Sequence, residues 1–141
     1  MRCKKSVGHL FLVISAVLVT LGSAPVNAAD YVAMSGQQLY ARFCASCHGI
    51  EARGDGPVAQ SFASKIPDLT SIARRHGGEF QRDWVERTID GRHKIAAHGA
   101  YTMPVWGEDF SRTEIGGPDA ERATRTIIGK LVDYLETLQQ K

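Results

Sequence analysis

Two cysteines and a histidine, Cys44, Cys47 and His48, form a Cys-x-x-Cys-His pattern, and they are the side chains of this sequence best suited to chemistry. On a helix, residues i, i+3 and i+4 share one face. From such a face two thiols can add to the two vinyl groups of a haem while the histidine turns its imidazole toward the iron. The pattern is typical of covalent haem attachment. It predicts one haem c, bonded to Cys44 and Cys47 and ligated by His48.

The first 28 residues have the order of a secretory signal peptide. Basic residues precede an apolar run over residues 10–21, and small residues follow it, ending at Ala28. This is the charged, apolar, small-residue order of an export signal, and the run is shorter than the roughly 20 residues of a membrane span. We expect a signal peptide over residues 1–28 and a single domain over residues 29–141, with an uncleaved N-terminal anchor as the alternative.

Two other chemistries use a Cys-x-x-Cys pair, a structural zinc site and a thioredoxin-like redox dithiol. Zinc normally takes four protein ligands, and Cys3 falls within the predicted signal, so Cys44 and Cys47 are the only cysteines of the expected mature chain. A redox dithiol is expected within a βαβ pattern, whereas this pair lies late in a stretch of helical period. A disulfide between them would close a loop so short that it adds little stability. These alternatives are disfavoured.

The charge balance changes when the signal is removed. The full chain holds 17 Lys and Arg against 15 Asp and Glu, whereas residues 29–141 hold 14 against 15, a net charge of −1. A nearly neutral domain without a basic block gives no support for nucleic-acid binding.

Helical period dominates the pattern of apolar residues, and no alternating apolar run argues for a sheet. Ser35 and Gln38 have capping-box spacing at the start of the first stretch, and Gly91 is placed to stop the second. Between the helices lie loops rich in Gly and Pro that also carry apolar residues, which indicates ordered loops packed around a buried group. We expect an all-α domain with three main helices, over residues 35–49, 79–90 and 118–138.

A six-coordinate haem needs a ligand on the side opposite His48. Met103 is the best candidate, because Pro104 blocks helix and stiffens the loop and a thioether in an apolar loop suits a Met/His haem. His98, five residues before Met103, is the alternative. The remaining candidates are a methionine near the start of the first helix and two histidines beside basic residues: Met34, His76 and His93.

These features together resemble the class I cytochromes c, in particular the small periplasmic single-haem cytochromes of proteobacteria, over essentially all of residues 29–141. The resemblance implies the cytochrome c fold, with long loops wrapped around one covalently attached haem and a small residue and an aromatic where the first and last helices cross. Besides the haem motif, it rests on Gly36 and Tyr40, on Leu131 and Tyr134 in the last helix, and on the Met103-Pro104 loop.

The resemblance also gives roles to residues near the haem. It assigns Pro57, in a Gly-x-Gly-Pro segment, as the residue whose carbonyl accepts the Nδ1 proton of His48, a bond that fixes the imidazole tautomer. Trp84 and Trp106 are candidates to donate an indole N–H to a haem propionate, with a core aromatic as the alternative for Trp84. Lysines, which ring the haem edge in the smallest members of the family, are few. Arginines are more numerous and are candidates for propionate contacts, a docking face or plain solvated surface.

The function that these features imply is one-electron transfer in the periplasm by a monomer, between a redox protein donor and a redox protein acceptor, including transient docking to a membrane complex. No enzymatic activity and no small-molecule substrate are expected. Two alternatives stay open. One is a haem c electron-transfer subunit of a larger oxidoreductase complex. The other is a haem sensor or peroxidase in which the sixth ligand is labile.

Overall fold

The computed structural model describes residues 28–92, 103–112 and 118–140, and none of these residues forms a strand. The all-α prediction is therefore confirmed. Nearly all of the predicted signal peptide lies outside the described residues. The helices are α1 (Ala28–Ala33), α2 (Gly36–Phe43), α3 (Ala45–His48), α4 (Ile72–Arg75), α5 (Arg82–Asp90), α6 (Trp106–Arg112) and α7 (Pro118–Thr137), with the 3₁₀ turns η1 (Ala59–Ser61) and η2 (Leu69–Ser71).

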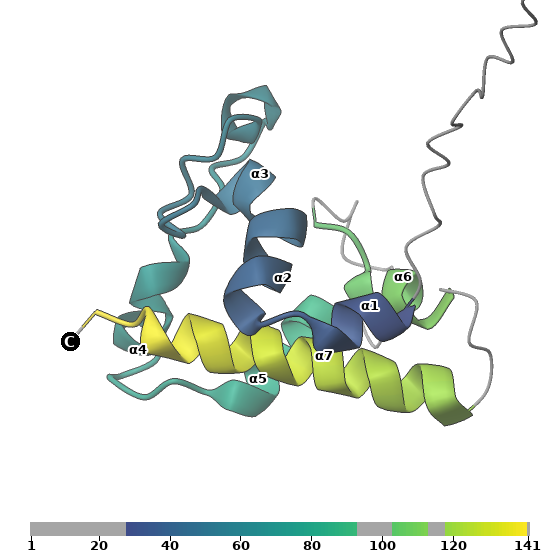
Figure 1. Ribbon diagram of the computed structural model, residues 1–141. Helices are drawn as coiled ribbons and strands as arrows, with labels where there is room; N and C mark the ends of the chain where they lie inside the picture. Colours follow the sequence, from purple (N-terminus) through teal and green to yellow (C-terminus); the bar gives the residue numbers. More distant parts are fainter. Residues whose placement is uncertain (1–27, 93–102, 113–117, 141) are drawn as a thin grey trace, which may run out of the picture.

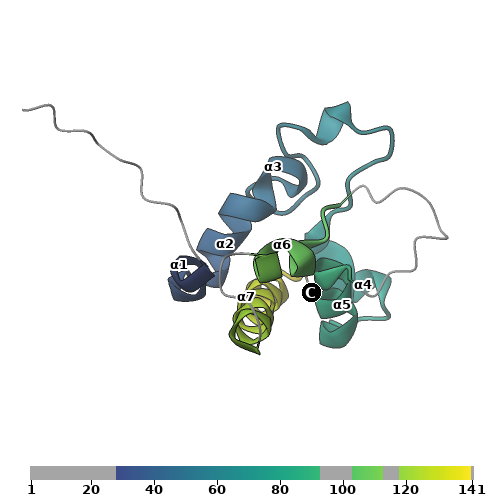
Figure 2. The same ribbon diagram turned by 90° about the vertical axis from the view of Figure 1, so that its right-hand side faces the viewer.

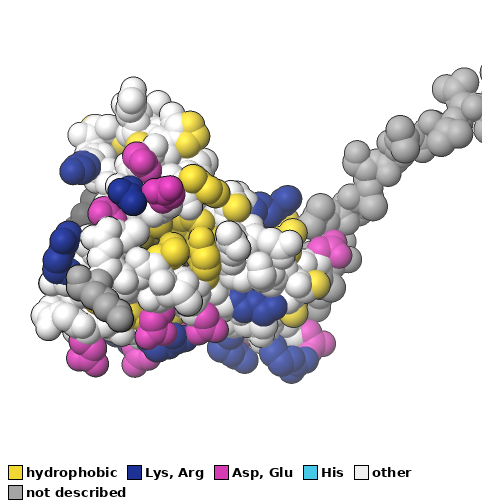
Figure 3. Space-filling view, turned by 60° about the vertical axis from the view of Figure 1, so that its left-hand side comes forward, with side chains coloured by type: hydrophobic (Ala, Val, Ile, Leu, Met, Phe, Trp, Pro, Cys, Tyr) yellow, Lys and Arg dark blue, Asp and Glu magenta, His cyan; other side chains and the backbone are white. Residues whose placement is uncertain are grey.

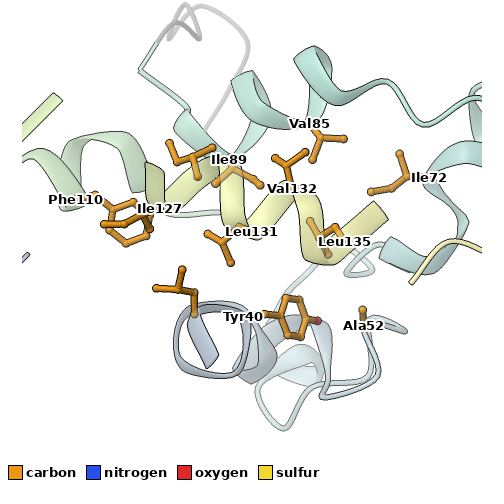
Figure 4. Close-up of a cluster of buried hydrophobic side chains, with 12 residues drawn as sticks. Tyr40, Ala52, Ile72, Val85, Ile89, Phe110, Ile127, Leu131, Val132 and Leu135 are labelled. Atoms are coloured by element: carbon orange, nitrogen blue, oxygen red, sulfur yellow. The ribbon is translucent and has the colours of Figure 1, made fainter. Parts of the chain in front are cut away.

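The long helix α7 organises the domain. It runs across the molecule and contacts α1, α2, α5 and α6 (Figure 1). Its apolar residues recur at three- and four-residue steps and form one face, which packs into the core. In Figure 4, Tyr40 approaches α7 from one side, and Val85 and Ile89 approach it from the other. Seen along α7, the helices α2 and α3 lie to one side and α4 and α5 to the other, with α6 between them (Figure 2).

The crossing of α2 and α7 depends on a glycine. A Cβ atom on Gly36 would lie 2.2 Å from the carbonyl oxygen of Lys130 and 2.9 Å from Cβ of Tyr134. The rings of Tyr40 and Tyr134 pack beside it with centroids 5.4 Å apart. The predicted meeting of a small residue and an aromatic with the last helix is thus confirmed.

The helix ends follow local chemistry, with some differences from the prediction. Ser35 and Gln38 form the predicted capping box at α2, and Gly91 ends α5 in the left-handed conformation, with φ of 71°. The first predicted helix is interrupted at Cys44, which separates α2 from α3. The second begins at Arg82, three residues later than predicted. The helices α1, α4 and α6 were not predicted, because four to seven residues are too few to show a helical period.

Candidate haem site

Two apolar cavities of about 200 and 270 Å³ lie beside the Cys-x-x-Cys-His motif, the smaller among α2, α3 and α6 and the larger among α4, α5 and α7. Four residues line both of them: Cys44, His48, Pro67 and Met103. The smaller cavity also borders Cys47, Pro104 and Trp106, and the larger is completed by side chains of α4, α5 and α7. On the face shown in Figure 3, apolar side chains gather at the centre and charged side chains surround them.

The turn after α3 is hydrogen-bonded to α3, the helix that carries Cys47 and His48. The carbonyl oxygens of Ser46, Cys47 and His48 accept hydrogen bonds from the backbone N–H groups of Val58, Gly56 and Gly54, at 3.1, 3.1 and 2.8 Å. Free carbonyls at a helix end need such partners. A Cβ on Gly56 would lie 2.4 Å from the carbonyl oxygen of Ser46, so the close approach requires glycine. The glycine-rich segment therefore fixes the orientation of α3.

His48 is buried, with 8% of its surface exposed. Its Nδ1 lies 3.2 Å from the carbonyl oxygen of Pro67. A carbonyl can only accept, so Nδ1 carries the proton and the lone pair lies on Nε2, the form that binds a metal. Burial lowers the pKa of His48, with the Pro67 carbonyl opposing this, so the imidazole is neutral near pH 7.

The carbonyl that faces His48 belongs to Pro67 and not to Pro57, so the role predicted for Pro57 is wrong. Pro57 is exposed, and it lies between Gly56 and Val58, whose N–H groups both bond to carbonyls of α3. Pro67 belongs to a different segment, which is held on both sides of the proline. Ile66, just before it, is buried, and the N–H of Leu69, two residues after it, donates to the Ala52 carbonyl at 2.8 Å. The Ile-Pro-Asp sequence at residues 66–68 indicates an extended segment. Its distance along the chain from His48 does not indicate that the Pro67 carbonyl lies beside the His48 ring.

The two motif thiols face the cavities as free cysteines. Cys44 borders both cavities and Cys47 the smaller one. Burial, and secondarily the nearby Cys47, raises the pKa of the Cys44 thiol to about 12. The two thiols therefore border apolar space, one from the residue that precedes α3 and one from within α3.

Met103 enters the site from a segment held by aromatic rings. Trp106, at the start of α6, packs against Phe43 with centroids 5.4 Å apart and stacks on Phe110 at 5.7 Å. Phe43 immediately precedes the motif, so these rings join the Met103 segment to the helix that carries Cys44. The structure thus brings Met103 and His48 to the same cavities although 55 residues separate them.

Two side chains that carry polar groups border the larger cavity. Arg75 and Trp84 border it, and Trp84 is 40% exposed. Arg75 Nη1 donates to the carbonyl of Asp68 at 2.7 Å and to Oγ of Ser71 at 2.5 Å. The ring of His76 packs against Trp84, with centroids 4.7 Å apart. From the sequence alone Arg75 is one of several arginines that are candidates for propionate contacts, and its position at a cavity follows only from the packing of α4.

The other candidate ligands are not at the cavities or are not described. Met34 and His76 line neither cavity. His93 and His98 lie outside the described residues. Within the part of the chain that the structure describes, no group of three or more His, Cys, Asp or Glu side chains is arranged to hold a metal ion. Among the same residues, no helix is both long and apolar enough to cross a membrane.

The residues around the cavities suit a haem. Two thiols three residues apart, a neutral histidine and a methionine border apolar space, and an arginine borders the larger cavity. This set supplies two covalent attachment points, two axial donors of the kind that haem iron accepts, and a cation for a carboxylate. Aliphatic side chains of three helices complete the walls: Ile72, Val85, Ile89, Leu131 and Leu135.

The comparison with known proteins agrees with this chemistry. Residues 32–117 match the family model described as Cytochrome C oxidase, cbb3-type, subunit III, and this segment includes the haem motif and Met103. No curated protein and no solved structure matches the chain. Domains of this kind carry covalently attached haem c and transfer electrons. The chain therefore belongs to this family of c-type cytochromes.

Proposed function

We propose that the chain is a periplasmic one-electron carrier whose haem c is bonded to Cys44 and Cys47 and has His48 and Met103 as axial ligands. The observation that carries the proposal is that His48 and Met103 border the same two cavities, together with Cys44. With both residues as ligands, a bound haem iron would have no open position, so it would transfer an electron without a bond to a substrate.

When bound, haem c supplies a reversible Fe(II)/Fe(III) couple. His48 presents Nε2 in a fixed orientation because Pro67 holds Nδ1. The neutral sulfur of Met103 favours the ferrous state. Aliphatic walls disfavour the additional charge of the ferric state, so both features raise the reduction potential.

We assign Arg75 and Trp84 to the propionate end of the haem. Arg75 is the charged side chain that borders the cavities, and Trp84 borders the same cavity from α5. Arginine offers donors in a planar fork that suits a carboxylate. Trp106 borders the smaller cavity, where its indole is the remaining candidate donor.

The ligand assignment is tested by the ferric absorption spectra of Met103→Ala and His98→Ala. The methionine-to-iron charge-transfer band should be present in the wild type and in His98→Ala, and absent from Met103→Ala. A band that survives in Met103→Ala, or disappears in His98→Ala, contradicts the assignment.

Export is part of the same proposal. A signal peptide over residues 1–28 delivers the chain to the periplasm, where it shuttles electrons between protein partners. N-terminal sequencing of the protein from the periplasmic fraction should begin at Ala29. Retention of residues 1–28 in a membrane fraction would instead support the N-terminal anchor.

A second candidate function follows from the family description, which names a subunit of an oxidase. In that case the same haem site serves as an electron-transfer subunit docked to a larger complex. Size-exclusion chromatography of the natively expressed protein in mild detergent separates the two. A monomer supports the shuttle, whereas co-elution with other oxidoreductase subunits supports the complex.

A further inference from the structure

The segment that carries Met103 is held at its far end by two close contacts with the C-terminus of α5. A Cβ on Gly91 would lie 3.3 Å from Cα of Val105. A Cβ on Gly107, in the first turn of α6, would lie 2.5 Å from Oδ1 of Asp90 and 2.6 Å from Nε of Arg92. The backbone at Gly107, four residues after Met103, therefore packs directly against the Asp90 and Arg92 side chains.

Those two side chains belong to an ion-pair cluster that also reaches α7. Arg92 Nε and Nη2 donate to the two carboxylate oxygens of Asp90, at 2.8 and 2.7 Å. Arg92 Nη1 and Nη2 donate to the two oxygens of Glu121, at 2.8 and 3.0 Å. The guanidinium thus forms a bidentate hydrogen-bonded pair with each carboxylate. Bidentate pairs are the strongest and most directional of the contacts between arginine and a carboxylate.

Two of the three side chains of this cluster are less exposed than any side chain in the other described ion pairs. The side chains of Arg92 and Asp90 are 28% and 15% exposed, and that of Glu121 is 42% exposed. Side chains in the other described pairs are 40–69% exposed. Exposed pairs add little rigidity, because solvent screens them and their side chains move freely. The Arg92 cluster is better placed to fix the backbone packed on it.

We propose that Asp90, Arg92 and Glu121 are positioning residues for Met103 and set how readily its sulfur leaves the iron. The inference rests on the proposed function, in which Met103 is the sixth ligand. The cluster joins the end of α5 to the start of α7, and α6 packs against it at Gly107. If the ion pairs of Arg92 are weakened, α6 and the Met103 segment lose the packing contact at Gly107. The aromatic contacts of Trp106 remain.

The test uses the holoprotein and imidazole as a competing ligand of the ferric iron, followed by loss of the methionine charge-transfer band. Arg92→Lys keeps the charge but removes the planar fork. Arg82→Lys is the matched control, since Arg82 pairs with Asp133 and Glu136 and so also joins α5 to α7, but from the first residue of α5, at the opposite end of that helix from Asp90. Glu121→Gln is the second variant, in case Arg92→Lys folds poorly.

We expect Arg92→Lys and Glu121→Gln to bind imidazole about tenfold more tightly than the wild type, and Arg82→Lys to stay within about twofold. Equal affinities in the wild type and the Arg92 and Glu121 variants overturn the inference. The same increase in Arg82→Lys also overturns it, because the effect then reflects general stability. A wild type without the band refutes the sixth-ligand assignment, and with it the inference.

Discussion

Replacement of Gly36 by alanine is expected to destabilise the holoprotein through the crossing of α2 and α7. The new methyl group would lie 2.2 Å from the carbonyl oxygen of Lys130, whereas ordinary van der Waals contact begins at 3.4 Å. The neighbour is backbone and cannot rotate away. The two helices must therefore separate by about 1 Å at this point, and a gap of that size forfeits a quarter to a half of each affected contact energy.

The expected cost follows from these distances. Overfilling a packed interior costs about 1–3 kcal/mol, and the better helix propensity of alanine returns at most about 1 kcal/mol. Because Gly36 is the first residue of α2, the return is smaller there. A net loss of about 2 kcal/mol lowers the Tm by about 8 °C for a domain of this size.

The assay is thermal unfolding of the holoprotein by circular dichroism, with Gly129→Ala as the control. Gly129 lies within α7, and a Cβ there meets nothing within 4 Å. The control should melt at the wild-type temperature or a few degrees above it, because helix propensity alone changes. A Gly36→Ala protein as stable as the wild type would refute the argument from the helix crossing.

Three further outcomes follow from single contacts. Ser35→Ala removes the capping box of α2 and should lower the free energy of unfolding in urea by about 1 kcal/mol; an unchanged midpoint would contradict this. The hydrogen bonds from Arg92 hold the pKa of Glu121 below its ordinary value, so this carboxylate stabilises the fold above its unfolded pKa and the benefit is lost as the pH falls through the folded value. Glu121→Gln should therefore lose less stability than the wild type between about pH 5 and pH 3, and parallel pH profiles would argue against the pairing. Lys130→Met removes two hydrogen bonds to carbonyls at the end of α1, and hydrogen exchange of α1 amides should become faster while that of α5 stays constant.

The haem motif and the helix ends were predictable because their chemistry is local. Ser35 and Gln38 cap α2 through neighbouring backbone groups, and Gly91 ends α5 because glycine accepts a positive φ without strain. The crossing at Gly36 was predictable from the resemblance, which placed the matching residues on the last helix.

The rest of the site depends on tertiary packing, which spacing along the chain does not specify. The acceptor for His48 is Pro67, because a buried Ile66 and a backbone hydrogen bond from Leu69 bring that segment to the ring. Similarly, Arg75 reaches the cavity only because α4 packs beside it, and four residues of helix leave no periodic signal.

Exposure of the ferrous holoprotein to carbon monoxide tests whether protein side chains occupy both axial positions of the iron. If His48 and Met103 occupy both axial positions, the absorption spectrum at neutral pH should not change, while that of Met103→Ala should shift at once to the carbon monoxide form. A rapid shift in the wild-type protein would show that the iron has an open or labile position. That result would contradict the carrier function and favour a sensor or peroxidase.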